Sequence, residues 1–242
     1  MAGRGAALVT GGARRIGRVL ATTAAEAGYD VAIHVRAIDD EAEAAAGEVR
    51  RHGRKATLLT CDLRKESASV ALVGEAEAEL GPITLLVNSA SVFEQDAFSD
   101  MNRASWDLHM ETNLRAPLVL AQVFARRLPA DREGLIVNVL DQRVWRPGPE
   151  FFSYTLSKTA LWAATRMLAQ ALAPRIRVNG IGPGPTLPSI HQDQADFDAE
   201  VASTLLQRPS SPQQIGAALR YLIDAEAVTG QMIAADSGQH LA

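Results

Sequence analysis

The chain has 242 residues, of which 47% are hydrophobic and 21% are charged, and its formal net charge at pH 7 is −4. This length and apolar content predict a single domain over residues 1–242, and the weak negative charge gives no reason to expect a nucleic acid or an anionic membrane as a partner. No apolar run approaches the ~20 residues that cross a bilayer, and the single cysteine, Cys61, excludes an intramolecular disulfide and predicts a reducing, cytoplasmic location.

Short apolar runs alternate with helical periodicity along the whole chain. Strands are predicted at residues 6–10, 31–35, 56–60, 83–87, 135–139, 175–179 and 231–235. Helices are predicted at residues 19–27, 41–52, 66–80, 103–127 and 154–173, and polar helical segments follow residue 185. The sixth strand is expected to be broken after residue 179 by Gly180, Gly182, Pro183, Gly184 and Pro185. The alternation is typical of an α/β fold with a doubly wound parallel sheet covered on both faces.

A glycine turn follows the first strand, with the sequence Thr10-Gly11-Gly12-Ala13-Arg14-Arg15-Ile16-Gly17. Glycines at a strand-to-helix turn let the backbone approach a pyrophosphate, and the helix N-terminus offers unpaired N–H groups. We therefore expect a dinucleotide there, in preference to an ordinary glycine turn. The expected contacts are Gly11, Arg14, Arg15, Ile16 and Gly17.

The end of the second strand bears on the choice of cofactor. An NAD site places an acidic residue there, whereas this chain has His34-Val35-Arg36, and Asp39 is better placed to cap the next helix. Arg36 and Arg14 together can clamp a 2′-phosphate, which favours NADPH. The alternative is that both arginines are simply solvated.

Tyr154 and Lys158 open a long predicted helix and lie four residues apart, so their side chains leave the same face one turn apart. A free tyrosine hydroxyl has a pKa of about 10, too high for ready proton transfer at neutral pH. The lysine cation is expected to stabilise the phenolate and lower that pKa, which would make Tyr154 a usable general acid.

Taken together, these motifs resemble the short-chain dehydrogenase/reductase superfamily from end to end. The glycine turn, Asn88-Ser89-Ala90, Asn113, Tyr154 with Lys158, and Pro183-Gly184 have that family's order and spacing. The resemblance implies a seven-stranded Rossmann sheet, a nicotinamide cofactor, and a homodimer or homotetramer. It implies a cofactor half at about residues 1–140 and a catalytic and substrate half at about residues 141–242.

The resemblance also implies roles for single residues. Lys158 would hold the nicotinamide ribose as well as tune Tyr154, and Asn113 would support a water-linked proton path to Lys158. Beyond the glycine turn, the expected cofactor contacts are His34, Val35, Arg36, Asp62, Leu63, Asn88, Ser89, Ala90, Tyr154, Lys158, Pro183, Gly184 and Thr186.

Three departures from the usual family pattern resemble one branch of it. Arg15 stands where the family usually has glycine, Ser91 replaces the last glycine of Asn-Asn-Ala-Gly, and Asp141 replaces the usual serine thirteen residues before the tyrosine. Together they are similar to the pteridine reductases, including the dihydromonapterin reductases. That branch implies an aromatic at Phe93 that sandwiches a flat heterocycle against the nicotinamide. The expected substrate contacts are Arg15, Ser91, Phe93, Asp141 and Tyr154.

An aspartate in place of the serine also bears on the chemistry. A ketone oxygen gains negative charge as hydride arrives, and an ionised carboxylate would oppose it, whereas a C=N nitrogen collects a proton through a cation-like state. We therefore expect NADPH-dependent reduction of a dihydropterin, such as dihydromonapterin or dihydrobiopterin, with catalytic residues Asp141, Tyr154, Lys158 and Asn113. In the alternative reading, Asp141 is a structural cap and Phe93 lines a general apolar pocket.

Two rival functions remain open: an ordinary carbonyl reductase of the same superfamily, and a non-catalytic NADP(H)-binding sensor. Tyr154, Lys158 and Asn113 together argue against the sensor, because binding alone needs no proton path. No metal is expected, since the five histidines show no ligand spacing. The segment at residues 185–208 is expected to cover the substrate.

Overall fold

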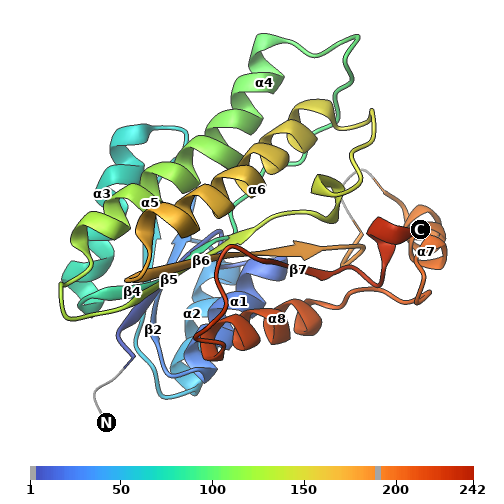
Figure 1. Cartoon of the computed structure of the whole chain (residues 1–242). Helices are drawn as coiled ribbons and strands as arrows, with labels where there is room; N and C mark the ends of the chain where they lie inside the picture. The colour runs from blue at the N-terminus through green and yellow to red at the C-terminus, as the bar shows by residue number, and fades with distance from the viewer. Residues whose placement is uncertain (1–3, 189–191) are drawn as a thin grey trace.

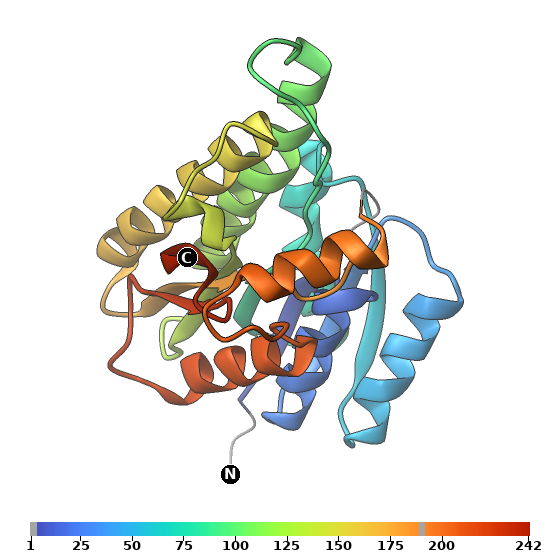
Figure 2. The same cartoon turned by 90° about the vertical axis from the view of Figure 1, so that its right-hand side faces the viewer.

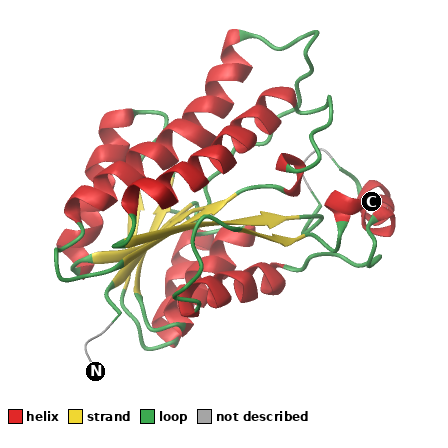
Figure 3. Ribbon diagram, in the orientation of Figure 1, coloured by secondary structure: helices red, strands yellow, loops and turns green. Residues whose placement is uncertain are grey.

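The structure is a computed structural model and describes residues 4–188 and 192–242. Seven strands form one sheet in the order β3-β2-β1-β4-β5-β6-β7, and each neighbouring pair is parallel. The predicted seven-stranded doubly wound sheet is confirmed, with helices above and below it (Figure 3). The strands are β1 (Ala6–Thr10), β2 (Asp30–Val35), β3 (Ala56–Thr60), β4 (Ile83–Asn88), β5 (Gly134–Val139), β6 (Ile176–Pro183) and β7 (Met232–Ala235).

Two helical layers cover the sheet (Figure 1). One layer consists of α1 (Arg15–Glu26), α2 (Asp40–Arg51) and α8 (Pro212–Asp224), and the other of α3 (Glu66–Leu80), α5 (Ala116–Arg127) and α6 (Phe152–Leu172). The shorter elements are α4 (Arg103–Met110), the π-helical turn η1 (Glu111–Arg115), the 3₁₀ turn η2 (Gln142–Val144), α7 (Gln194–Ser203) and the 3₁₀ turn η3 (Gln239–Leu241). In the described residues, none of these helices has the length and apolar character to span a bilayer.

Strand β1 shows why the central strands read as continuous apolar runs. Ala7 and Val9 pack in the core beneath α1, α2 and α8, while Ala6 and Leu8 pack in the core on the other face. Successive side chains of a strand point to opposite faces, so a strand covered on both faces must be apolar throughout. Each fully buried Leu or Val contributes about 1.5–3 kcal/mol.

Strand β6 is longer than predicted: it continues through Pro183 rather than ending at residue 179. The expectation that its glycines break the strand is wrong. A Cβ on Gly180 would lie 2.4 Å from Leu140 Cδ1, and one on Gly182 would lie 2.9 Å from Met232 Sδ. The glycines therefore allow neighbouring side chains to pack tightly against an unbroken strand.

Candidate active site

The candidate residues gather at the carboxyl ends of the strands. From β1 the chain continues toward one edge of the sheet, through β2 and β3, and from β4 it continues toward the other edge, through β5, β6 and β7, so the strand order reverses between β1 and β4. Such a switch point is the usual ligand-binding edge of a doubly wound sheet. Figure 2 looks onto this edge, with α7 lying across it in front of the sheet.

Asp141 and Tyr154 form a direct contact. Asp141 follows β5 and precedes η2, and Tyr154 lies in the first turn of α6. The tyrosine hydroxyl donates to Asp141 Oδ2 at 2.8 Å, and the backbone N–H of Arg143 donates to Asp141 Oδ1 at 2.8 Å. One carboxylate oxygen therefore caps η2, as the structural reading expected, while the other binds the hydroxyl of Tyr154.

The pKa of Tyr154 does not move in the expected direction. Burial and the charge of Asp141 raise it well above the ordinary value of about 10. Lys158 Nζ lies 5.8 Å from the centroid of the tyrosine ring, and its hydrogen bond goes to the Val139 carbonyl at 2.8 Å. The expectation that Lys158 lowers the pKa of Tyr154 is therefore wrong.

Two ionisable groups of opposite charge, Asp141 and Lys158, are buried at this site. Burial raises the pKa of the Asp141 carboxyl, and burial lowers the pKa of Lys158 to about 8, although the charge of Asp141 partly opposes that fall. Lys158 is only 2% exposed. Perturbed groups of this kind, placed together at a ligand-binding edge, are typical of acid–base chemistry.

Asn113 lies in the π-helical turn that interrupts the long helix predicted at residues 103–127. Its Oδ1 accepts from the backbone N–H of Val92 at 2.8 Å and from the Ser91 hydroxyl at 3.2 Å. Its Nδ2 donates to the Val92 carbonyl at 2.9 Å and to Ser157 Oγ at 3.2 Å. Asn113 thus fastens the loop after β4 to helix α6, and π turns are frequent at functional sites.

Two stacked phenylalanines stand beside the tyrosine. The ring centroids of Phe93 and Phe151 are 4.1 Å apart, and the angle between the ring planes is 12°. The rings of Phe93 and Tyr154 are nearly perpendicular, with centroids 4.7 Å apart. The Arg143 guanidinium lies 5.2 Å from the Phe151 centroid. Phe93 was expected here, whereas sequence reasoning missed Phe151; its signal was an aromatic residue immediately before the helix that carries Tyr154.

Asp96 is a second residue that sequence reasoning missed. Its Oδ1 accepts the backbone N–H of Ser153 at 2.9 Å, and its carbonyl accepts the N–H of Phe152 at 3.0 Å. These bonds satisfy N–H groups at the start of α6 and hold the turn that carries Tyr154. The sequence does not indicate this cap, because Asp96 and Ser153 are 57 residues apart in the chain.

The glycine turn is packed too closely for side chains at two of its positions. A Cβ on Gly11 would lie 3.0 Å from Ala90 Cα, and one on Gly17 would lie 2.0 Å from the Gly11 carbonyl oxygen. Only glycine therefore allows the turn to pack this closely against the loop after β4 and against the start of α1, as in the strand-to-helix turns that bind dinucleotides.

His34 supports this turn from beneath. Its Nδ1 accepts the N–H of Gly11 at 3.4 Å and its Nε2 contacts the Cys61 carbonyl at 3.1 Å, which requires the neutral tautomer with the proton on Nε2. Burial lowers the His34 pKa, in keeping with a neutral ring.

The start of the loop after β4 faces the glycine turn. The Thr10 hydroxyl accepts the N–H groups of Ser89 and Ala90, each at 3.0 Å. Asn88 Oδ1 is buried and has no hydrogen-bond partner among the described residues, which leaves an acceptor for a ligand. Beside these residues, hydrogen bonds from Arg64 lower the pKa of Asp62 to about 2.

The arginines near the cofactor edge differ in what they contact. Arg14 pairs with Asp39 and, at 2.5 Å, with Glu41. Asp39 also caps α2 by accepting the N–H of Ala42 at 2.9 Å, which confirms its predicted capping role. Arg36 is exposed. To bind a 2′-phosphate, Arg14 would therefore have to leave Asp39 and Glu41 or contact the phosphate in addition to them.

Arg15 lies on the other side of the turn and contacts the segment after β6. Its backbone is left-handed, with φ of 48°, and its guanidinium donates to the carbonyls of Leu187 at 3.1 Å and Pro188 at 3.0 Å. Arg15 therefore anchors the start of the expected covering segment, of which residues 189–191 lie outside the described residues. Thr186 donates to the Gly184 carbonyl at 3.0 Å.

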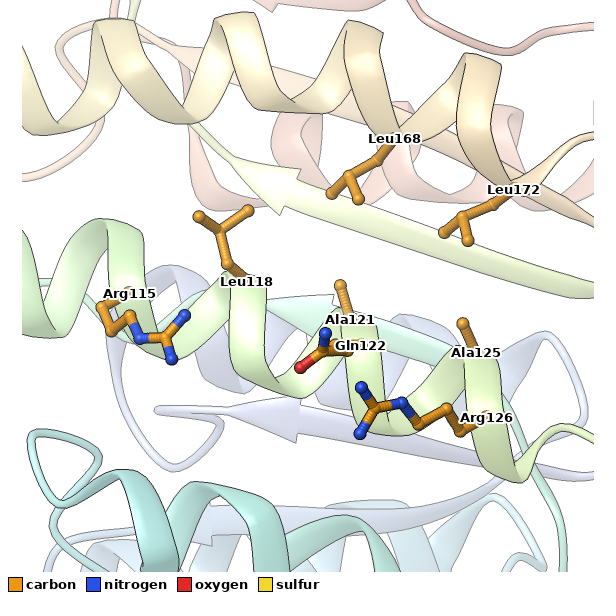
Figure 4. A pocket seen from close by; sticks show the side chains of 8 residues that line it. All are labelled: Arg115, Leu118, Ala121, Gln122, Ala125, Arg126, Leu168 and Leu172. Atoms are coloured by element: carbon orange, nitrogen blue, oxygen red, sulfur yellow. The ribbon is translucent and has the colours of Figure 1, made fainter.

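Two further observations bear on what the site contains. In the described part of the chain, no group of three or more His, Cys, Asp or Glu side chains is placed to hold a metal ion. A groove of about 440 Å³ runs between α5 and α6, lined by residues such as Leu118 and Leu168 (Figure 4). None of the candidate site residues lines it, so it is separate from the candidate active site.

Two solved structures cover the whole of this chain. One is FolM alternative dihydrofolate reductase 1 from Brucella suis in complex with NADP, at 48% identity, with a TM-score of 0.95 over 100% of this chain and 97% of that one. The other is its counterpart from Brucella canis with NADP, at 49% identity, with a TM-score of 0.95 over 100% and 96%. The likeness to a pteridine-reductase branch, predicted from the three departures, is confirmed by these neighbours.

Sequence relatives outside that branch are more distant. The chain is 30% identical to 2-dehydro-3-deoxy-D-gluconate 5-dehydrogenase of Dickeya dadantii, over 96% of this chain and 94% of that protein. It is 27% identical to 3-oxoacyl-[acyl-carrier-protein] reductase FabG of Staphylococcus epidermidis, over 97% and 98%. The short chain dehydrogenase family model matches residues 5–198. The chain therefore belongs to the short-chain dehydrogenase family of nicotinamide-dependent oxidoreductases.

Proposed function

We propose that this chain reduces a dihydropterin, such as dihydromonapterin or dihydrobiopterin, to its tetrahydro form with NADPH. The observation that carries the proposal is the hydrogen bond between Tyr154 and Asp141, at the position where the family usually has serine. A carboxylate beside the proton donor favours an acceptor that becomes cationic, as the nitrogen of a C=N bond does. NADPH, when bound, supplies the hydride.

Tyr154, Asp141 and Lys158 have different roles in the proposed delivery of the proton. Tyr154, with its raised pKa, stays protonated at neutral pH and donates its hydrogen bond to Asp141. Burial raises the pKa of Asp141, and its carboxylate accepts the hydrogen bond that Tyr154 donates. Lys158 contributes a buried cation that offsets the charge of the carboxylate, and it would hold the ribose of the cofactor. The proton thus reaches the substrate nitrogen through the Tyr154–Asp141 pair.

NADPH is preferred over NADH for two reasons. Arg36, and not an acidic residue, directly follows β2, where NAD enzymes place the carboxylate that binds the ribose hydroxyls. The two Brucella neighbours were crystallised with NADP. The site residues expected from sequence, among them Ser91 and Phe93 on the substrate side, are proposed in the same roles.

A carbonyl reductase is the second candidate, because several sequence relatives carry names of keto-group enzymes. Purified protein mixed with NADPH and either dihydromonapterin or dihydrobiopterin tests the choice. The proposal expects loss of absorbance at 340 nm with a dihydropterin and little with simple ketones or sugars. No loss with either dihydropterin, together with turnover of a ketone, would replace the proposal with the second candidate.

The homodimer or homotetramer and the cytoplasmic location implied at the level of sequence stay predictions. Light scattering on the purified protein tests the first, and fractionation of the source cells tests the second.

A further inference from the structure

An exposed cluster of ion pairs lies where the glycine turn meets the start of α2. Helices α1 and α2 lie side by side on one face of the sheet (Figure 1). The N–H of Gly12 donates to the His34 carbonyl at 3.2 Å, which holds the turn against the end of β2. From this turn Arg14 reaches α2, where it pairs with Asp39 and Glu41. The cluster thus stands at the edge where a dinucleotide-binding sheet recognises the adenosine ribose.

The two carboxylates hold adjacent donors of one guanidinium group. Arg14 Nε lies 2.5 Å from Glu41 Oε2, and Arg14 Nη2 contacts Asp39 Oδ2. Nε and Nη2 form one edge of the guanidinium, and such an edge is a pair of donors that can bind a phosphate through two parallel hydrogen bonds. A 2′-phosphate can therefore take this edge of Arg14 only by displacing a carboxylate.

Asp39 and Glu41 differ in what else they do. Asp39 Oδ1 accepts the N–H of Ala42 at 2.9 Å and caps α2, and this hydrogen bond, together with the charge of Arg14, lowers the pKa of Asp39. Glu41 lies in the first turn of α2, and its side chain is 58% exposed. An exposed ion pair contributes little to folding. The effect of Glu41 on ligand binding can therefore be measured separately from stability.

The local charge shows why a carboxylate must leave when a phosphate binds. The segment after β2 is exposed and net negative, with one arginine and three acidic residues: Arg36, Asp39, Asp40 and Glu41. A phosphate monoester has a charge of about −1.5 to −2 at pH 7. A carboxylate that stayed beside it on Arg14 would repel it, so the Glu41 pair has to open.

We infer that Glu41 competes with the 2′-phosphate of NADPH for Arg14 and so limits the preference for NADPH over NADH. NADH has a neutral hydroxyl at that position, so it does not need the Arg14–Glu41 pair to open. Glu41 is thus a specificity-determining residue that acts against the phosphorylated cofactor. The inference rests on the proposed preference for NADPH and is independent of the pterin substrate.

Fluorescence titration of the purified protein with each cofactor, without substrate, tests the inference. For Glu41→Gln at low ionic strength we expect the Kd of NADPH to fall about fivefold, the upper end of what an exposed ion pair contributes, and the Kd of NADH to change less than about twofold. The matched control is Glu43→Gln, which removes the same charge from the same turn of α2, where Glu43 lies 4.0 Å from Arg50. The control should leave the ratio of the two Kd values as in the wild type. An unchanged ratio in Glu41→Gln, or an equal change in both variants, would overturn the inference.

Two further measurements separate this competition from other effects of charge. In an Arg14→Gln background, we expect Glu41→Gln to change the Kd of NADPH less than about twofold, because the group for which Glu41 competes is gone. A gain as large as that in the wild-type background would overturn the inference.

The gain in Glu41→Gln should also shrink in 1 M salt, where the Debye length is about 3 Å, and a gain of undiminished size there would contradict an electrostatic competition. Failure of the proposed NADPH preference has a different signature. Equal Kd values for NADPH and NADH in the wild type would remove that preference, whereas the change of their ratio in Glu41→Gln decides the inference.

Discussion

Around the glycine turn, His34 and Thr10 are buried groups that act as neutral hydrogen-bond partners, whereas the buried groups around Tyr154 include an acid and a base of opposite charge. His34 satisfies Gly11 and Cys61 as a neutral ring, and Thr10 satisfies Ser89 and Ala90. By contrast, Asp141 and Lys158 are buried with their pKa values moved toward the neutral forms.

The difference indicates that the two ends contribute differently to stability. A neutral, hydrogen-bonded cluster adds to the free energy of unfolding, while a buried charge pair has a large desolvation cost. The hydrogen bonds around the glycine turn are thus expected to stabilise the fold, and the region around Tyr154 retains ionisable groups that the proposed function needs. Substitutions at the two ends should therefore separate stability from turnover.

The largest effect on turnover is expected for Tyr154→Phe. Loss of the hydroxyl removes the proton donor and the hydrogen bond to Asp141, and general acid catalysis contributes about 10²–10⁴-fold. We expect kcat for the dihydropterin to fall within that range, measured at 340 nm, while NADPH affinity, measured by fluorescence titration, changes little. A variant that keeps more than a tenth of the wild-type kcat would show that Tyr154 is not the donor.

The largest effect on stability is expected for Gly17→Ala at the cofactor end. The new Cβ would lie 2.0 Å from the Gly11 carbonyl oxygen, so the turn must shift. We expect the free energy of unfolding, measured in urea, to fall by about 3 kcal/mol. The control is Gly47→Ala in α2, which meets nothing within 4 Å and should raise stability by up to about 1 kcal/mol. Equal changes in the free energy of unfolding for the two variants would contradict the claim that Gly17 is closely packed against Gly11.

An intermediate effect concerns pH at the catalytic end. Burial lowers the pKa of Lys158 to about 8, so in the free enzyme its charge is lost as pH rises through that value. We expect kcat/KM to fall about tenfold per pH unit above it, because kcat/KM reports groups of the free enzyme. Lys158→Arg, whose side chain does not titrate in this range, should remove the fall even if its overall rate is low. Persistence of the fall would assign it to another group.

The smallest effect concerns pH at the cofactor end. The His34 pKa is lowered in the folded chain, so the unfolded chain binds the proton more readily and stability is lost as pH falls below the unfolded value of about 6.5. Between pH 7 and 5.5 this amounts to at most about 1 kcal/mol, measured by urea unfolding. His34→Gln should have a smaller pH dependence than the wild type. Identical pH dependence in the two would exclude His34 as its source.

Much of the fold was predictable because its signals are local. Five-residue apolar runs such as Ala6–Thr10 give strands buried on both faces, and Asp39 gives the start of α2. The extension of β6 was not predictable, because Gly180 and Gly182 leave room for the side chains of Leu140 and Met232, which lie elsewhere in the chain.

The candidate site divides in the same way. The family resemblance placed Asp141 beside Tyr154, because Asp141 stands where the family usually has its serine, and the two side chains are hydrogen-bonded. It did not give the raised pKa of Tyr154, because burial and the Asp141 charge depend on the packed structure. The contacts of Asp96 and Phe151 were missed for the same reason: their partners are set by the path of the loop after β4.

The central claim is that the acid beside Tyr154 selects a nitrogen acceptor, and Asp141→Ser tests it most directly. The serine restores the residue that the family usually has at this position and removes the carboxylate that binds the tyrosine hydroxyl. Rates of NADPH oxidation would be measured for wild type and variant, with a dihydropterin and with a panel of ketones. We predict that the variant loses dihydropterin reduction and keeps or gains ketone reduction. A variant that reduces the dihydropterin as well as the wild type would contradict the claim.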